Sequence, residues 1–538
     1  MFDNRGHHNS KFLHIMYVSL ILLVIYFFIT SLINGGITFD EPGIKAMINN
    51  HLRIGLSGAK LGSYLDYDIP YYGMVHLLPG YLLYRIVILF HDFGGSNQAV
   101  FYMVMHISFF IMGVATSWVI YNLLKLFNVN SAIALTSSAL LLVYPTWIGS
   151  SFFNFKDIPA SFFFTLYTYF ICEYSIRKNN NISYKIAITG ALLCSVKFAF
   201  VPIIVVNHLY LLCRVVFMGQ NFMEQDHCLK KINNIMMIGL ITIIFIYIMT
   251  PAAWRSPIFY LTNEIRLMSH HTWGGCTAIL GNCINVQSAN WQAWKYLLTW
   301  YIAQIPTFFI LIFVPGLVVM FNNLVRNFKS HIIYIPILLQ MLLLPILASI
   351  HNSVFYDGTR HTLFCVPMIV FISCIGLNWL LTNTINSVVL RRVFLTIASI
   401  VLFGSFTVLL CDLLTLNPYQ YSYFNEWYRI FYADKKIDND YWAFSYKEAY
   451  DTIADGVVAS KVIKIYPDFI DISDYSNPKS QPADDKEWYL IGSLRTQNDV
   501  RRYIKDKSLN CDMIHEVQRN LLFLKDPMVM SVIFRCKS

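Results

Sequence analysis

The chain has 538 residues, of which 56% are hydrophobic and only 13% are charged. Soluble domains carry about 25% charged residues, so this composition excludes an ordinary water-soluble protein. The net charge of +9 does not come from one basic tract, because Lys and Arg sit in short connections such as 214–231 and 326–329. Cytoplasmic loops of membrane proteins concentrate these residues, so the charge indicates topology and not a nucleic-acid partner.

Apolar runs recur from residue 13 to residue 414. A helix needs about 20 apolar residues to cross a ~30 Å hydrocarbon layer, so these runs predict an all-α polytopic membrane protein with about eleven transmembrane helices. The first run follows Arg5 and Lys11 and has no small-residue cleavage site, which predicts a retained anchor with a cytoplasmic amino end. The predicted spans are 13–34, 73–92, 101–122, 131–151, 158–176, 186–212, 233–252, 299–321, 331–350, 362–382 and 393–414.

One part of this topology conflicts with the charge pattern. From a cytoplasmic start, the segments expected outside are 35–72, 253–298, 351–361 and everything after 414. The same count leaves Arg177 and Lys185 outside and Asp157 inside, against the tendency of basic residues to stay in the cytoplasm. A miscounted or re-entrant segment between 101 and 213 would reverse both, and the stretch 144–157 is a candidate half-crossing. The side of Asp157 therefore stays open, with the outside favoured.

The last part of the chain has a different character. Region 415–538 has ordinary charge density and no spanning run, so we expect a small C-terminal α/β soluble domain beside a transmembrane domain, 1–414. Stretch 441–453 predicts an amphipathic helix. Short β-branched runs predict strands at 461–466, 488–491, 515–517, 521–524 and 529–534. The sequence lacks the glycine-rich signatures of nucleotide-binding loops, which disfavours an ATP-driven pump.

Two adjacent acids, Asp40 and Glu41, follow the first predicted span and open an outside loop. A carboxylate there could take the proton from an acceptor hydroxyl while that hydroxyl attacks an anomeric carbon, which is general-base catalysis. The alternative is structural, because acids beside Pro42 would favour the positive end of a helix dipole. Such caps are common, so both interpretations stay open at this point.

A second polar group lies between two late spans, where Tyr356, Asp357, Arg360 and His361 stand together. The guanidinium of Arg360 offers fork-shaped donors that suit a phosphate, and it stays charged at any working pH. The alternative is an arginine that anchors a helix end at the lipid headgroups.

The outside loop 253–298 contains a third candidate group, His270, His271 and Trp273. Its donors and aromatic ring suit a sugar or a phosphate. Two adjacent histidines without a further ligand at helical spacing are weak evidence for a metal. We therefore expect no cofactor, with a divalent metal as the alternative.

Lys197 interrupts the apolar run 191–206. An intramembrane charge is a functional hypothesis by default, and its expected partner is Asp157 or a donor phosphate. The alternative is a lysine whose stem lies along its helix while the amine reaches the surface.

Most of the 11 cysteines lie inside apolar runs, where a thiol is a small hydrophobic group. Two pairs fall in segments expected outside, where disulfides persist. These candidate pairs are Cys276 with Cys283 and Cys511 with Cys536, and the sequence does not fix their geometry.

Taken in order, these residues resemble the GT-C glycosyltransferases of the protein O-mannosyltransferase and aminoarabinose-transferase type, especially their bacterial branch. The resemblance covers about residues 13–450. It rests on the acidic pair at 40–41, Asp157 before Pro159, Lys197 in the sixth hydrophobic segment, the block 356–361, and the aromatic blocks 417–425 and 440–449.

The resemblance implies an inverting enzyme that moves a sugar from a polyprenyl-phosphate carrier, such as undecaprenyl phosphate, to an acceptor hydroxyl. Asp40 would be the base and Glu41 would orient it or the acceptor. Arg360, Lys197 and His361 would hold the donor phosphate. Other substrate contacts would come from Asp157, His270, His271, Trp273, Tyr356 and Asp357. Many enzymes of this type are thought to need no catalytic metal.

The resemblance also bears on the acceptor and the location. The long loop lacks the large domain that eukaryotic mannosyltransferases insert, so a glycan acceptor such as lipopolysaccharide or O-antigen is favoured over a protein. The chain would be a multi-pass protein of the cytoplasmic (inner) membrane, with its amino end cytoplasmic and its C-terminal domain periplasmic.

Two other classes stay as alternatives. A lipid-linked-sugar flippase would also show many spans with intramembrane charges, but repeated halves would be expected and none is visible. A polysaccharide polymerase or ligase would centre its chemistry on a large outside loop between late spans. The loop 253–298 keeps that alternative open.

Overall fold

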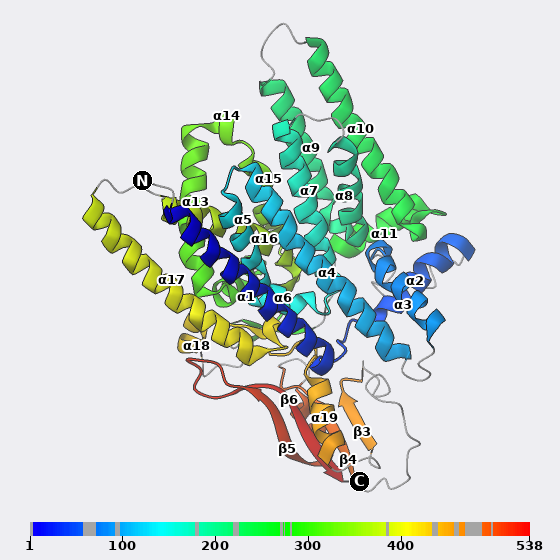
Figure 1. Ribbon diagram of the computed structural model, residues 1–538. Coiled ribbons are helices and arrows are strands. Elements are labelled where there is room, and N and C mark those ends of the chain that lie inside the picture. The colour runs from blue at the N-terminus through cyan, green and yellow to red at the C-terminus, as the bar shows by residue number, and fades with distance from the viewer. Residues whose placement is uncertain are drawn as a thin grey trace.

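The computed structural model describes residues 4–57, 72–91, 97–177, 182–218, 225–269, 273, 275–279, 282–382, 387–432, 439–456, 462–468, 487–495 and 499–537. A large body of helices carries a small sheet at one end (Figure 1). We call the end that holds the loop 35–42 and the region 417–537 the sheet end. The far end is the opposite one, where α7 finishes at Arg177.

The chain forms its elements in the following order. The helices of the body are α1 (Asn4–Asn34), α2 (Gly43–Leu52), α3 (Leu78–Phe90), α4 (Asn97–Leu126), α5 (Ser131–Ala139), α6 (Pro145–Ser151), α7 (Asp157–Arg177), α8 (Ser183–Val196), α9 (Val201–Met218), α10 (Gln225–Met249), α11 (Pro257–Ser269), α12 (Ala293–Gln304), α13 (Thr307–Arg326), α14 (Phe328–His331), α15 (Tyr334–Ile350), α16 (Val366–Thr382) and α17 (Val388–Leu416). The remaining elements are the hairpin β1 (Cys276–Ile279) and β2 (Asn282–Asn285), then α18 (Glu426–Tyr432), α19 (Tyr446–Gly456), β3 (Val462–Tyr466), β4 (Glu487–Gly492), α20 (Val500–Asp506), β5 (Asn510–Arg519) and β6 (Met528–Lys537).

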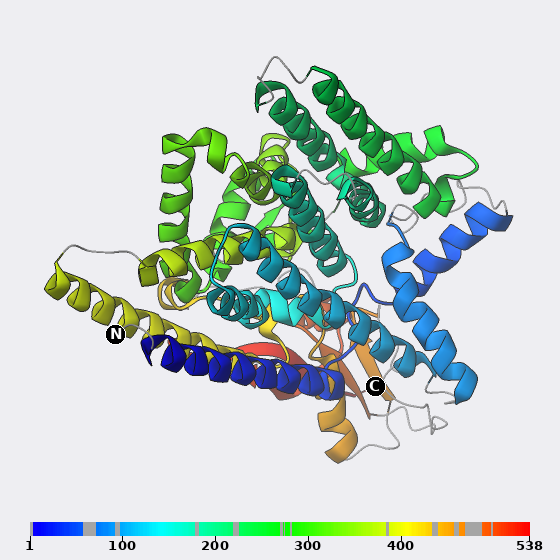
Figure 2. The same cartoon turned by 45° about the horizontal axis from the view of Figure 1, so that its top comes forward.

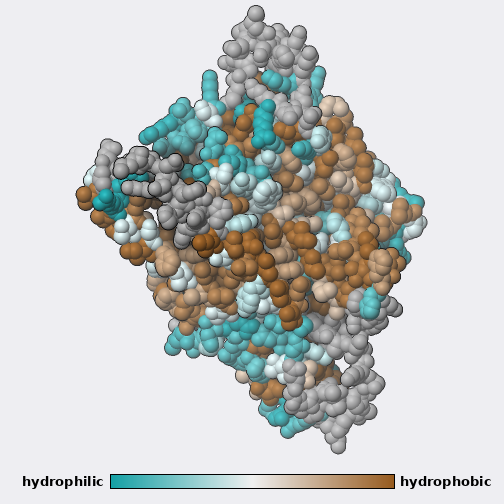
Figure 3. All heavy atoms as spheres, in the orientation of Figure 1, coloured by the Kyte–Doolittle hydropathy of each residue, from teal (hydrophilic) through white to brown (hydrophobic). Residues whose placement is uncertain are grey.

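The body has the surface of a membrane protein. Of the described helices, seven are long and apolar enough to cross a membrane, or eight if a bent pair counts as one span. Apolar side chains form a broad band between two more polar ends (Figure 3). In α17 only 6% of the most apolar window is buried inside the protein, as expected for a helix that faces lipid. The fold is thus an all-α polytopic body with a small C-terminal sheet domain.

The bent pair lies where the sequence predicts a half-crossing. Its two parts, Ser131–Val143 and Pro145–Ser151, meet at 70°. Proline has no N–H and cannot continue a helix, so the break falls immediately before Pro145. The second part delivers Asn154 and Asp157 to the sheet end.

The predicted span 73–92 is wrong, because α3 stays at the sheet end. With 13 residues it is about 20 Å long, too short for the hydrocarbon layer. It lies against the first turns of α4, where the ring centroids of Tyr84 and Phe101 are 5.2 Å apart. Farther along α4, His106 contacts the loop after α1. The helix therefore packs beside the start of α4 and does not cross.

The predicted span 186–212 is also wrong, because it contains two helices. At Lys197 the backbone is extended, which ends α8. α9 then returns to the far end, where Arg214 donates to the carbonyl of Ser175 at 2.7 Å. The two helices run in opposite directions, so Arg177 and Lys185 lie at the far end, which also carries the other basic connections. This arrangement removes the conflict with the charge pattern.

The C-terminal region packs closely on the body. The Arg429 guanidinium makes two hydrogen bonds to Asp412 in α17, at 2.8 and 2.5 Å, and both side chains are fully buried. Two backbone bonds join the loop after α1 to this region: Gly36 N–H donates to the Phe444 carbonyl at 2.9 Å, and Phe39 N–H to the Trp442 carbonyl at 3.3 Å. Residues 36–39 and 442–444, which are about 400 positions apart in the sequence, thus pack side by side.

The small domain has a mixed sheet in the order β3-β4-β6-β5, with β3 parallel to β4 and the other pairs antiparallel. Helix α19 packs on it (Figure 1). Four predicted strands are present, but 521–524 is a turn between β5 and β6, because Phe523 takes a positive φ of 63°. Both candidate cysteine pairs are bonded, Cys276 to Cys283 and Cys511 to Cys536.

Candidate active site

The loop after α1 gives its two acids different surroundings. Glu41 is fully buried, and its carboxylate accepts from the Thr38 N–H at 2.6 Å and lies 2.5 Å from Nε2 of His106. The Asp40 side chain is 32% exposed and reaches the surface of the site. Glu41 therefore fixes the shape of the loop, while Asp40 is the acid that a substrate can reach.

Two cations hold the Asp40 carboxylate. The Lys156 ammonium lies 3.2 Å from it and the Arg360 guanidinium 3.6 Å from it. Burial acts to raise the pKa of Asp40, but the positive charges of Lys156 and Arg360 outweigh burial and keep the pKa below its ordinary value. Asp40 is therefore ionised at neutral pH, as a general base must be.

Asp157 and Lys197 form a second pair beside the first. Asn154 orients Asp157 by donating to its carboxylate at 3.0 Å and accepting from its N–H at 2.9 Å. Lys197 donates to the other carboxylate oxygen, from the break between α8 and α9. A backbone bridge to Tyr72 holds that break in place. Asp157 thus lies at the same end of the body as Asp40.

Arg360 lies at the centre of the group. Its guanidinium carbon is 4.6 Å from the ring centroid of Tyr356 and 4.5 Å from that of Trp442, so it is held between two aromatic faces. Besides Asp40 it contacts the Asp357 carboxylate at 3.3 Å. Its side chain is 8% exposed, and its Nε–H has no hydrogen-bond partner among the described residues. One buried donor is therefore available to a ligand.

The turn before Arg360 has an unusual backbone that neighbouring helices support. Asp357 and Gly358 have positive φ values of 58° and 69°, which only glycine adopts easily. On α12, Gln304 accepts from the Thr359 N–H at 3.0 Å and Tyr296 donates to the Gly358 carbonyl at 3.0 Å. These bonds keep the turn in the conformation that directs Asp357 and Arg360 toward each other.

Two residues of the candidate site, Lys156 and Arg495, are not predicted from the sequence. Lys156 is visible only as the neighbour of Asp157, yet it makes the closer contact to Asp40. Arg495 comes from the C-terminal domain and donates to Asp357 and, at 3.3 Å, to the carbonyl of Tyr441. The sequence around Arg495 shows no periodicity or motif that would single it out.

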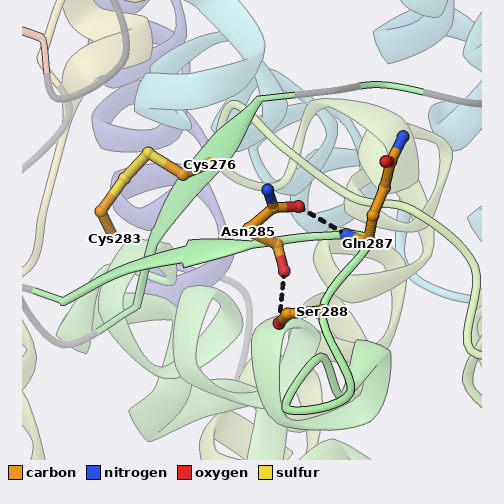
Figure 4. Close-up of a disulfide and its surroundings, with 5 residues drawn as sticks. All are labelled: Cys276, Cys283, Asn285, Gln287 and Ser288. Atoms are coloured by element: carbon orange, nitrogen blue, oxygen red, sulfur yellow. Dashed lines mark hydrogen bonds between the residues drawn. A yellow bond between two sulfur atoms is a disulfide. The ribbon is translucent and has the colours of Figure 1, made fainter.

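Trp273 extends the aromatic surface of the site. Its ring stacks on Tyr356, with centroids 4.3 Å apart and planes 12° from parallel. The His361 ring stands edge-on to the same tyrosine at 4.6 Å. A disulfide between Cys276 and Cys283 cross-links the hairpin that follows Trp273, and Asn285 begins the turn after β2 by accepting from the Gln287 N–H and the Ser288 hydroxyl (Figure 4). His270 and His271 lie outside the described residues.

The ionisable side chains of the candidate site carry a net positive charge. The described side chains in this group of ion pairs comprise three carboxylates and four cations: Asp40, Asp157, Asp357, Lys156, Lys197, Arg360 and Arg495. An excess of positive charge in a partly buried group favours an anionic ligand. Within the described ranges, no three His, Cys, Asp or Glu side chains form a group that could hold a metal ion. The expectation of a metal-free reaction stays a prediction.

Comparison with solved structures gives several matches, two of which are structures of one protein. No family model and no curated protein matches the chain. A crystal structure of ArnT from Cupriavidus metallidurans in the apo state is 12% identical, with 98% of each chain covered and a TM-score of 0.46. The structure of the same protein bound to undecaprenyl phosphate is 11% identical, with 97% of each chain covered and a TM-score of 0.44. What the chain does must therefore be inferred from its own residues.

Proposed function

We propose that this chain is an inverting GT-C glycosyltransferase that moves a sugar from a polyprenyl-phosphate carrier to an acceptor hydroxyl at the outer face of the membrane. The main support is one juxtaposition: the ionised, partly exposed Asp40 carboxylate lies 3.6 Å from the buried Arg360 guanidinium, where helices of an apolar body meet polar loops. A polyprenyl carrier keeps its tail in the bilayer and its phosphate at the headgroups, so both substrates can meet at this level.

The chemistry follows from the charges. Asp40 would take the proton of the acceptor hydroxyl as its oxygen attacks the anomeric carbon from the face opposite the phosphate. The bond between that carbon and the phosphate oxygen would break, and both bonding electrons would leave with the carrier phosphate. Arg360, Lys197 and Lys156 would stabilise the negative charge that develops there. Attack from the opposite face inverts the anomeric carbon, and Asp40 then releases its proton to water.

The Trp273 ring stacks on Tyr356 and is partly exposed, so it suits the apolar face of a sugar ring. Asp157 would act by keeping Lys197 in place. The proposal includes the orientation: the sheet end faces the periplasm of the inner membrane, the basic far end and the amino terminus face the cytoplasm, and the acceptor is a surface glycan.

The test is a transfer assay in membrane vesicles with a panel of labelled polyprenyl-phosphate sugars. The intact chain should transfer label with inversion, and Asp40→Asn should not. Asp451→Asn is the matched control, because Asp451 is 46% exposed and its ion pair is with Lys447 on the same helix. Equal transfer by Asp40→Asn and the control, or no transfer from any sugar of the panel by the intact chain, would overturn the proposal.

A further inference from the structure

Arg495 reaches the site from outside the helical body. It lies after β4 of the C-terminal sheet, and its side chain is 7% exposed. One terminal nitrogen donates to Asp357 and the other to the carbonyl of Tyr441. Its Nε–H has no hydrogen-bond partner in the part of the chain that the structure describes. The sheet domain thus places a buried guanidinium beside Asp357, which the sequence assigns to the membrane domain.

The placement of Arg495 changes what Arg360 can do. Asp357 lies between the two guanidinium groups, with one carboxylate oxygen toward each. If Arg495 were absent, Arg360 would be the cation left in the described ion pairs of Asp357, while it also faces Asp40. A buried carboxylate needs a compensating charge, so the positive charge of Arg360 would then be largely neutralised inside the protein. With Arg495 present, the group keeps an excess of positive charge.

We propose that Arg495 is a positioning residue for the donor phosphate: by neutralising Asp357, it leaves the charge of Arg360 available to the phosphate of the carrier. This inference rests on the proposed function and deepens it. The carrier phosphate gains negative charge as its bond to the sugar breaks, so the effect extends from binding to the transfer step. The site is therefore complete only when the C-terminal domain is docked.

Docking of that domain does not depend on Arg495 alone. Arg429 pairs with Asp412 of α17 at 2.5 Å, and the Gly36 N–H donates to the Phe444 carbonyl at 2.9 Å. Loss of Arg495 is thus expected to leave the domain folded and in place. A matched control exists on α20, where Arg501 is 51% exposed and pairs only with the nearby Asp499 in the described contacts.

The experiment measures equilibrium binding of radiolabelled undecaprenyl phosphate to the full chain in detergent. Arg495→Gln should weaken binding about tenfold, because Asp357 would then neutralise Arg360 and the group would lose one net positive charge at an intermediate effective dielectric. Arg501→Gln should bind like the intact chain. Arg495→Gln loses one partner of a buried ion pair and should unfold at a lower temperature, so binding is compared at a temperature at which both variants are folded. Arg495→Lys, which keeps the charge, should retain most of the affinity.

The decisive variant combines Arg495→Gln with Asp357→Asn. Removing the carboxylate that Arg495 balances should restore the affinity, whereas a merely structural or docking role for Arg495 would give no rescue. Equal binding by Arg495→Gln and Arg501→Gln, or a double variant as weak as Arg495→Gln, would overturn the inference while the proposed function stands. If the intact chain itself bound no undecaprenyl phosphate, the proposed function would fail and this inference with it.

Discussion

Replacing Asp40 by Asn separates catalysis from donor binding. The amide has the same shape and stays beside Lys156 and Arg360, but it cannot accept a proton. Because Asp40 lies 3.6 Å from Arg360, its negative charge also competes with a donor phosphate for that cation. We therefore expect Asp40→Asn to abolish most transfer while undecaprenyl phosphate binds as tightly as before, or more tightly.

The size of the effect follows from the geometry. A positioned general base contributes about 10²–10⁴-fold to the rate, so kcat should fall by that factor, which corresponds to about 3–5 kcal/mol. Lys156 and Asp40 are 19% and 32% exposed, so losing their ion pair should cost the fold only about 1 kcal/mol. Asp40→Glu keeps the base but moves the carboxylate by about one carbon–carbon bond, and a misplacement of that size costs about 10²-fold.

The assay compares kcat for transfer with the Kd for undecaprenyl phosphate in the intact chain, Asp40→Asn and Asp40→Glu. A loss of binding in Asp40→Asn that matches the loss of transfer would refute the reasoning, because the acid would then be holding the donor. Unchanged kcat in that variant would assign the base to another residue.

Three further changes test the surroundings of the site. Arg360→Lys should raise KM for the donor at least about tenfold, because an ammonium cannot face Asp40 and Asp357 while stacking between two rings; an unchanged KM would contradict the assigned role. Glu41→Gln should lower the free energy of unfolding by about 1–3 kcal/mol, because the buried carboxylate contacts the Thr38 N–H and His106. Thermal unfolding measures this change, and a variant as stable as the intact chain would show that the loop does not depend on these contacts. Burial raises the pKa of Glu264 on α11 to about 8, so the folded state binds its proton more tightly than the unfolded state and loses stability as pH rises from about 4.5 to about 8. Glu264→Gln should therefore raise the unfolding temperature at about pH 8 and leave it unchanged at about pH 4.

The apolar body and the bent segment before Asp157 could be predicted, because both depend on local composition and on a proline. The two wrong spans have a common physical cause. Window hydropathy cannot distinguish a short helix packed on another helix, such as α3, from one that crosses lipid. Window hydropathy also cannot detect that a single residue has an extended backbone. Lys197 is such a residue, and it ends one helix inside an otherwise continuous apolar run.

Much of the candidate site could also be predicted. Asp40, Asp157 and Arg360 each lie near an end of a hydrophobic segment, and the ends of such segments meet at a membrane surface. Lys197 is recognisable as a charge inside such a segment. Arg495 could not be predicted, because its role depends on how a sheet docks on helices far away in the sequence. Tertiary contact alone gives that residue its partner, Asp357.

The backbone bonds between residues 36–39 and 442–444 have a consequence for biosynthesis. A ribosome completes the segment that bears Asp40 long before it reaches Trp442 or Arg495, and in the proposed orientation those later residues must first be translocated. A nascent or truncated chain would therefore contain Asp40, the proposed base, but would lack Trp442 and Arg495, which complete the site. Under the proposed function, the protein would not consume the cell's lipid-linked sugar until translation has ended.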